Sequence, residues 1–185
     1  MLYGDKELES TLMKLNIDLA RLLAQTALWA SPDVFRLLME ENHDGTWYPN
    51  TRRYRQNRGE ISGQTVGNVY LDTNNYPNTA IKRAIGLDRD VQNYHACHVW
   101  PESCYDERYH TCIANLVLLP RAIAGLSDHD TLIQQSLRYH SYELYKWHPQ
   151  GEATPKMPNG YPKEWRSPFV FSDRVQKYLN RRKRI

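Results

Sequence analysis

The strongest constraint on the fold lies in residues 94–120, YHACHVWPESCYDERYHTCIANLVLLP, which hold all three cysteines of the chain. The part that ends at Pro101 favours an extended strand, because a proline disfavours helix for the residue before it. A loop of mixed polarity follows, and Asn115 then opens the aliphatic run LVLLP, which predicts a short buried strand. The apolar spacing of DHDTLIQQSLRYHSYELYKW predicts a long helix, capped by Ser127. We therefore expect strand, loop, strand and helix, with His98 ending the first strand and Asn115 starting the second.

The composition is that of one soluble globular domain, with 185 residues, 41% hydrophobic and 24% charged, and a net charge of +3. The opening residues MLYGDKELES include acids and lack an apolar core, so we expect no secretory signal. No apolar run approaches the ~20 residues of a membrane-spanning helix, so we expect no membrane partner. Three cysteines are an odd number and do not favour a disulfide framework. Reduced thiols predict a cytoplasmic protein.

The rest of the chain predicts mainly helices. A leucine stripe predicts an amphipathic helix over residues 5–29, and it fits an intramolecular core better than a dimer seam: Leu8, Leu12, Leu15, Leu19 and Leu22. Ser31 and Pro32 form a cap and first-turn pair for the next helix. The later predicted elements are a long loop over 42–66, a strand TVGNVYLD, a helix NTAIKRAIG ended by Gly86, one or two helical turns in RAIAGL and a terminal helix over 172–184.

Three zones follow from this layout within one compact domain. They are a helical region with a basic loop (1–90), a central core with its following helix (91–148) and a C-terminal extension (149–185). The extension contains a long proline-rich connection. We expect it to be pinned to the surface by its aromatic residues Trp147, Tyr161 and Trp165.

Positive charge gathers in TRRYRQNR, residues 51–58, which contain four arginines and no acid. Guanidinium groups bind phosphate oxygens bidentately, so this segment predicts contacts with a nucleic-acid backbone. The alternative interpretation is a solvated loop. The predicted nucleic-acid-binding residues are Arg52, Arg53, Arg55, Arg58 and Arg121.

The motif His-Val-Trp-Pro, followed by Asn-Leu-Val-Leu-Leu seventeen residues after the histidine, resembles the HNH nucleases of the ββα-metal superfamily. The resemblance covers roughly residues 91–130. It implies that His98 is the base that activates water, and that Asn115 either ligates a divalent cation or clamps the loop that aims the histidine. The implied cofactor is Mg²⁺ or Mn²⁺ and the implied substrate is double-stranded DNA. A site-specific, restriction-type member is expected to act as a homodimer.

The chain departs from the family pattern at its metal ligands. Cys97 stands where the family has an acid or a histidine, and Ala124 stands where the family often has its third ligand. The nearest replacements at the start of the following helix are Asp128, His129 and Asp130, of which the first two are preferred. The expected metal ligands are therefore Asn115, Cys97, Asp128 and His129.

A second interpretation uses the cysteines as zinc ligands. A tetrahedral zinc site can be closed by His95, Cys104, His110 and Cys112, with Cys97 as a further candidate. Such a zinc ion would brace the nuclease loop, or it would stabilise a nucleic-acid-binding module without catalysis. A third interpretation is an interaction protein whose amino-terminal helices form a dimer. Of the three interpretations we prefer the first, the nuclease. We expect an α+β protein with a ββα-metal (HNH) core embedded in a mainly helical single domain, acting as an endonuclease.

Overall fold

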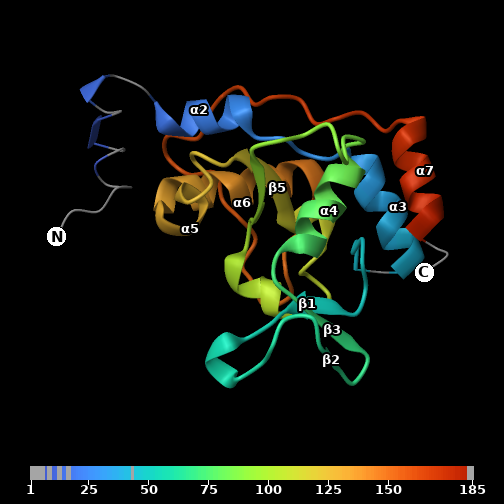
Figure 1. Ribbon diagram of the computed structural model, residues 1–185. Helices are drawn as coiled ribbons and strands as arrows, with labels where there is room; N and C mark the ends of the chain where they lie inside the picture. The colour runs from blue at the N-terminus through green and yellow to red at the C-terminus, as the bar shows by residue number, and fades with distance from the viewer. Residues whose placement is uncertain (1–6, 8–9, 12–13, 16–17, 43, 183–185) are drawn as a thin grey trace.

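The computed structural model describes residues 7, 10–11, 14–15, 18–42 and 44–182, and it shows a mixed α+β single domain (Figure 1). At its centre lies an antiparallel hairpin of β4 (Tyr94–His98) and β5 (Leu116–Pro120). Tyr94 pairs with Pro120 and His98 pairs with Leu116. On the other edge of β5, Leu118 exchanges two main-chain hydrogen bonds with Leu28, of 2.9 and 3.1 Å. The four aliphatic side chains of β5 are fully buried, so this strand is the centre of the core.

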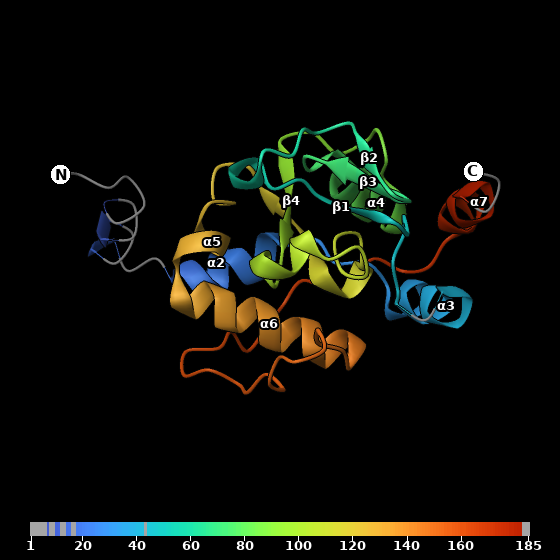
Figure 2. The ribbon, with the colours of Figure 1, turned by 90° about the horizontal axis from the view of Figure 1, so that it is seen from below.

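Helices cover the hairpin on two sides, with α4 on one side and α6 on the other (Figure 2). The helices in the described part of the chain are α2 (Leu19–Thr26), α3 (Pro32–Asn42), α4 (Asn75–Ala84), α5 (Leu126–His129), α6 (Thr131–Tyr145) and α7 (Asp173–Arg182). Short 3₁₀ turns lie at η1 (Gln56–Arg58), η2 (Pro101–Tyr105) and η3 (Ile113–Asn115). None of the helices that the structure describes is long and apolar enough to cross a membrane.

A small second sheet forms an arm below the hairpin in Figure 1. Its central strand β3 (Val69–Asp72) pairs in parallel with β1 (Thr51–Arg53) and antiparallel with β2 (Thr65–Val66). The single strand predicted over TVGNVYLD is wrong, because Val66 pairs with Val69 across a two-residue turn. Gly67 opens that turn at φ 63°, a conformation that favours glycine. The arm delivers Arg53 and Asp72 to the open end of β4.

The predicted continuous helix over 5–29 is also wrong within the described residues. Asp18 is extended, and its carboxylate accepts a hydrogen bond from the Arg21 amide at 3.0 Å, so α2 begins only at Leu19. The helix ends at Thr26 because the residues after it run extended to pair with β5. Leu8 and Leu12 lie outside the described residues. Leu15 is 64% exposed and does not join the core.

Other boundaries agree with local sequence chemistry. Ser31 Oγ accepts from the Asp33 amide at the start of α3, and Gly86 ends α4 at φ 76°. The expected cap of the long helix is wrong: Asp130 caps α6 by accepting from the Ile133 amide at 2.7 Å. Ser127 belongs instead to the short α5, and its hydroxyl donates to the Ala124 carbonyl. RAIAGL forms turns that lead into α5 rather than a helix of its own.

The C-terminal connection is anchored as predicted. The Arg166 amide donates to the Ala24 carbonyl at 3.0 Å, and the Phe169 amide donates to the Trp29 carbonyl at 2.9 Å. Trp165 stacks on His140, with ring centroids 3.9 Å apart. Tyr161 donates a 2.5 Å hydrogen bond to Glu143. The connection delivers α7 to its place against α4.

Candidate active site

A pocket of about 220 Å³ opens at the end of β4, where the hairpin, the arm and α5 meet. Four elements contribute side chains to its wall, which comprises Arg53, Asn74, His95, Ala96, Cys97, His98, Pro101, Ala124, Gly125 and Asp128. The wall therefore combines an arginine, two imidazoles, a thiol and a carboxylate. His98 ends β4 and Asn115 immediately precedes β5, which confirms the positions predicted for both residues.

His98 is only 6% exposed and is held by a hydrogen bond of 2.9 Å between its Nε2 and the main-chain carbonyl of His110. A carbonyl can only accept, so Nε2 carries the proton and Nδ1 has the free lone pair. Nδ1 has no hydrogen-bond partner within the described part of the chain. Burial, followed by the neighbouring His110, lowers the pKa of His98 to about 3. The imidazole is therefore neutral at physiological pH, and burial in the free protein disfavours its protonated form.

Asn115 is completely buried and holds together the loop between the two strands. Its Oδ1 accepts from the Trp100 amide at 2.9 Å, while its Nδ2 donates to Ser103 Oγ at 2.8 Å and to the Tyr109 carbonyl at 3.0 Å. These bonds engage both polar atoms of the amide, and Asn115 does not contribute to the pocket wall. Of the two roles expected for this residue, the geometry supports the clamp rather than the metal ligand.

A buried Asp72–His110 pair supports the carbonyl that holds His98. His110 Nε2 lies 3.1 Å from Asp72 Oδ2, and the two side chains are 0% and 3% exposed. The same Asp72 oxygen accepts from the Tyr76 amide at the start of α4. The rings of His98 and His110 are stacked at 5.3 Å. Burial lowers the pKa of His110, while Asp72 acts in the opposite direction.

Sequence reasoning missed Asp72. The only sequence signal is an acid at the end of an otherwise apolar strand, and that pattern does not identify a partner 38 residues away. The structure supplies this partner by placing β3 beside the loop that carries His110.

The residues expected to bind a metal ion are only partly brought together. Asp128 and Cys97 share the pocket wall with His95, whereas Asn115 and His129 do not line it. Burial raises the pKa of Cys97 to about 11, so its thiol is protonated and is a poor ligand for a hard cation. Within the described residues, no group of three or more His, Cys, Asp or Glu side chains is placed to hold a metal ion. One carboxylate and one imidazole fit a hydrated cation such as Mg²⁺, which keeps several waters and binds substrate phosphates.

The alternative zinc ligands are separated from one another. His95 faces the pocket, His110 is paired with Asp72, and Cys104 and Cys112 are buried as free thiols. Burial raises the pKa of Cys104 to about 11 and that of Cys112 to about 12, which disfavours the thiolate form that zinc binds. The structure therefore does not gather these four residues into a tetrahedral set.

The five predicted nucleic-acid-binding arginines have different surroundings. Arg53 lines the pocket. Arg52 is neutralised by a bidentate pair with Glu60, at 2.8 and 2.7 Å, and this pair lowers the pKa of Glu60 to about 2. Arg55 lies over the Tyr105 ring at 5.2 Å. Arg58 and Arg121 are exposed on the surface. Of the five, only Arg53 contributes to the pocket wall.

Comparison with family models, with curated proteins and with solved structures finds no match to this chain.

Proposed function

We propose that this protein is a metal-dependent endonuclease of the HNH (ββα-metal) type, which hydrolyses phosphodiester bonds in double-stranded DNA. The observation that carries the proposal is the orientation of His98. Its Nε2 is held by the His110 carbonyl, and the residue lines a pocket that also contains Arg53 and Asp128. The strand–loop–strand–helix order around this pocket supports the same assignment.

The chemistry follows from these side chains. Nδ1 of His98, whose lone pair is free, accepts the proton of the attacking water as the water oxygen bonds to phosphorus and the bond from phosphorus to the leaving oxygen breaks. The negative charge of a bound phosphate beside the ring raises the pKa of His98 above its low value in the free protein and so makes it a stronger base. Arg53 binds a non-bridging oxygen of the scissile phosphate through its guanidinium group. When bound at Asp128 and His95, a divalent cation such as Mg²⁺ or Mn²⁺ supplies Lewis-acid stabilisation of the negative charge. Asn115 and the Asp72–His110 pair act through His98 by fixing the loop that holds it.

Plasmid cleavage tests this proposal. Supercoiled DNA is incubated with the protein and Mg²⁺, Mn²⁺ or EDTA, beside His98→Ala and the matched control His129→Ala. His129 is exposed and outside the pocket. We expect metal-dependent cleavage by the parent protein and by His129→Ala, with loss of cleavage in His98→Ala.

The form of the products separates further possibilities. Discrete linear fragments support a site-specific, restriction-type enzyme acting as a homodimer on symmetric sites. Nicking alone supports the chemistry without that specificity. The proposal would be rejected if the parent protein and His98→Ala cleaved equally, or if the parent protein cleaved no DNA with any of the metals.

A further inference from the structure

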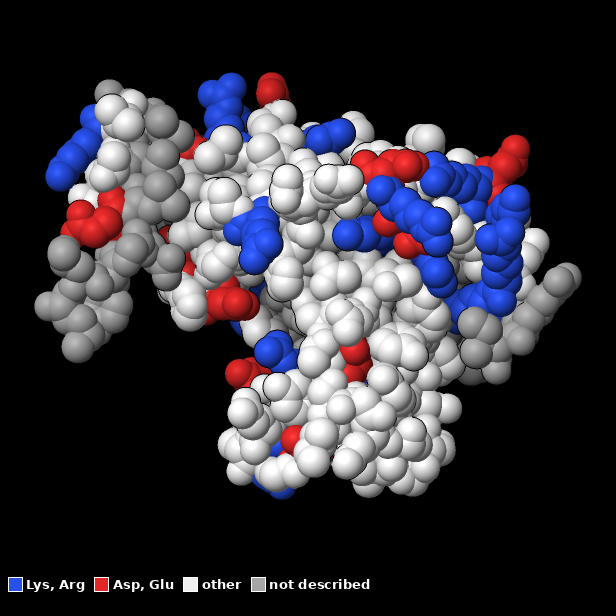
Figure 3. All heavy atoms as spheres, viewed as in Figure 1, with Lys and Arg blue, Asp and Glu red and all other residues white. Residues whose placement is uncertain are grey.

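A second concentration of positive charge lies between α4 and α7, away from the arginine-rich loop. A pocket of about 500 Å³ there is lined by Arg83, Asp88, Arg89, Arg174, Tyr178 and Arg181. A neighbouring pocket of about 380 Å³ on α7 shares Arg181 and adds Lys177. Figure 3 shows lysine and arginine side chains gathered over α4 and α7. We name Arg83, Arg89, Arg174, Lys177 and Arg181 the α4–α7 basic surface.

Only two of these five cations are paired with acids. Arg174 lies 2.6 Å from Asp90, and Arg83 lies 3.5 Å from Asp88 while it also donates to Tyr48 at 2.7 Å. Arg89, Lys177 and Arg181 have no ion-pair partner within the described part of the chain. Asp173 lines the α7 pocket beside Lys177 and Arg181. With Asp88 and Asp90, three acids therefore oppose the five cations, which leaves a net charge of about +2 on this surface.

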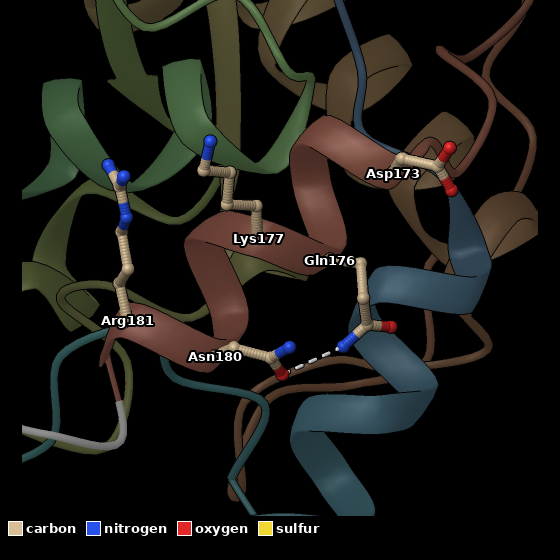
Figure 4. Close-up of a pocket in the computed structure, with 5 residues that line it drawn as sticks. All are labelled: Asp173, Gln176, Lys177, Asn180 and Arg181. Carbon is tan, nitrogen blue, oxygen red and sulfur yellow. Dashed lines mark hydrogen bonds between the residues drawn. The ribbon is translucent and has the colours of Figure 1, made fainter.

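Arg181 is shared by two adjoining pockets, with Arg89 beside it in one and Lys177 beside it in the other. Lys177 and Arg181 are one helical turn apart, and Figure 4 shows both side chains extending from α7 toward α4. Gln176 and Asn180 hydrogen-bond to each other at 3.0 Å on another side of the same helix. The helix dipole favours basic residues in the last turn, which accounts for Arg181 in α7 and Arg83 in α4. It does not account for Arg89, which follows α4, or for Lys177 in the middle of α7.

This surface is held in a fixed position. Arg182, at the end of α7, pairs with Glu41 and donates to the main-chain carbonyls of Thr46 and Trp47. Val175 and Leu179, also on α7, are buried in the core. Arg174, Lys177 and Arg181 therefore project from a helix that is packed on the core.

The α4 helix connects the basic surface with the candidate active site. Asn74, at its amino-terminal cap, lines the active-site pocket, and Arg83, in its last turn, lines the basic pocket. Ten helical residues span roughly 15 Å. That length corresponds to about four to five base pairs of duplex DNA, at 3.4 Å per base pair.

We propose that the α4–α7 basic surface binds the phosphate backbone of the DNA duplex several base pairs from the cleaved bond. This inference rests on the proposed nuclease function for the identity of the polyanion. The three unpaired cations are spread over two open pockets: Lys177 and Arg181 lie on α7, and Arg89 lies in the turn after α4. This spread fits the repeated phosphates of a nucleic-acid backbone better than a single small anion. Contacts of this kind position the duplex without reading its sequence.

Salt-dependent binding tests the inference without requiring catalysis. The His98→Ala protein is titrated with a fluorescent 30-base-pair duplex at several KCl concentrations. Arg89→Gln, Lys177→Gln and Arg181→Gln are then added together to this protein. Each phosphate contact contributes about 0.9 to the slope of log K against log salt, so we expect the slope to fall by two to three units. At 0.1 M salt the affinity should fall by roughly 100-fold or more.

A matched control removes the same charge elsewhere: Arg21→Gln, Lys156→Gln and Lys163→Gln in the same His98→Ala protein. These three residues are exposed and lie outside both the active-site pocket and the basic surface. An equal change of slope in the control and the test protein would overturn the inference, because the effect would then depend only on net charge. Tighter binding to single-stranded or structured RNA than to the duplex would overturn it too.

The two proposals fail in different ways. If the parent protein cleaves plasmid DNA but the triple substitution leaves the slope unchanged, the basic surface is rejected and the nuclease function stands. If the slope falls as expected while the parent protein cleaves nothing, the basic surface stands and the nuclease function is rejected.

Discussion

The imidazole of His98 and the main-chain carbonyl of His110 are joined by a hydrogen bond of 2.9 Å. This bond determines which nitrogen of His98 carries the proton, because the carbonyl can only accept. The orientation of His98 therefore depends on the position of His110. That position depends in turn on the buried carboxylate of Asp72 and on the clamp made by Asn115.

Asp72→Asn should lower the rate of DNA cleavage while leaving DNA affinity unchanged. The substitution replaces the carboxylate that holds the His110 ring by a neutral amide. His110 is then held less firmly, and its main-chain carbonyl positions the His98 ring less well. We expect the cleavage rate to decrease by about 10- to 100-fold, which is the usual effect of removing a residue that orients a functional side chain through a hydrogen bond. Single-turnover cleavage at saturating protein measures the rate. Asp33→Asn, at an exposed acid outside the active-site pocket and the basic surface, serves as the control. Normal cleavage by Asp72→Asn would show that the pair does not position His98.

Asn115→Ala should destabilise the whole protein. The substitution leaves the Trp100 amide without its partner at a fully buried position, and the Tyr109 carbonyl keeps only the 3.3 Å hydrogen bond from the Cys112 amide. A buried group left unsatisfied costs about 1–3 kcal/mol, so we expect unfolding free energy to fall by roughly 2–4 kcal/mol. Urea denaturation measures this change. Asn68→Ala, in the exposed turn of the arm, is the matched substitution and should change stability by less than about 0.5 kcal/mol.

Stability should fall as the pH is lowered from 7 to 5. Burial lowers the pKa of His98 and of His140 to about 3 in the folded protein, against about 6.5 in the unfolded chain. The unfolded state therefore binds more protons between pH 6.5 and pH 3, and stability is lost as the pH falls through this window. Each histidine contributes about 1.4 kcal/mol per pH unit below 6.5, which is roughly 2 kcal/mol each at pH 5.

Urea midpoints at pH 7, 6 and 5 measure this loss. In His140→Gln the pH dependence should decrease by about 1.4 kcal/mol per unit below pH 6.5, because one of the two buried imidazoles is gone. His129→Gln removes an exposed imidazole and should leave the dependence unchanged. Identical pH profiles for His140→Gln and the parent protein would contradict the assignment.

Local chemistry in the sequence predicts much of the central hairpin. His98 before Val-Trp-Pro and Asn115 before the aliphatic run are found at the ends of β4 and β5, because a proline and a short continuous apolar run act over a few residues. The leucine pattern does not reveal the cap at Asp18, and the predicted helix runs on to residue 29. The chain becomes extended after Thr26 instead, where Leu28 pairs with Leu118, ninety residues away in the chain. Tertiary pairing overrides helical periodicity there.

The candidate site is less predictable than the hairpin. Adjacent arginines such as Arg52 and Arg53 look equivalent in sequence, yet they alternate across a strand, so one meets Glu60 and the other lines the pocket. The contribution of Asp72 depends on the parallel pairing of β1 and β3, for which the sequence has no local signal. Likewise, the cysteines suggest zinc ligands by spacing alone, whereas burial places them among core residues.

The two adjacent arginines give a direct test of the pocket. Arg53→Gln removes the guanidinium that lines the pocket, and we expect cleavage to fall by about 10²- to 10³-fold, as for the loss of one donor to a developing negative charge. Arg52→Gln removes the same charge from the same strand and breaks the pair with Glu60 and a hydrogen bond to the main-chain carbonyl of Arg53. It takes no side chain from the pocket wall, so cleavage should change by no more than a few-fold. Single-turnover cleavage of one duplex by both variants compares the two positions. A larger loss of cleavage in Arg52→Gln than in Arg53→Gln would show that the scissile phosphate does not bind at the end of β4.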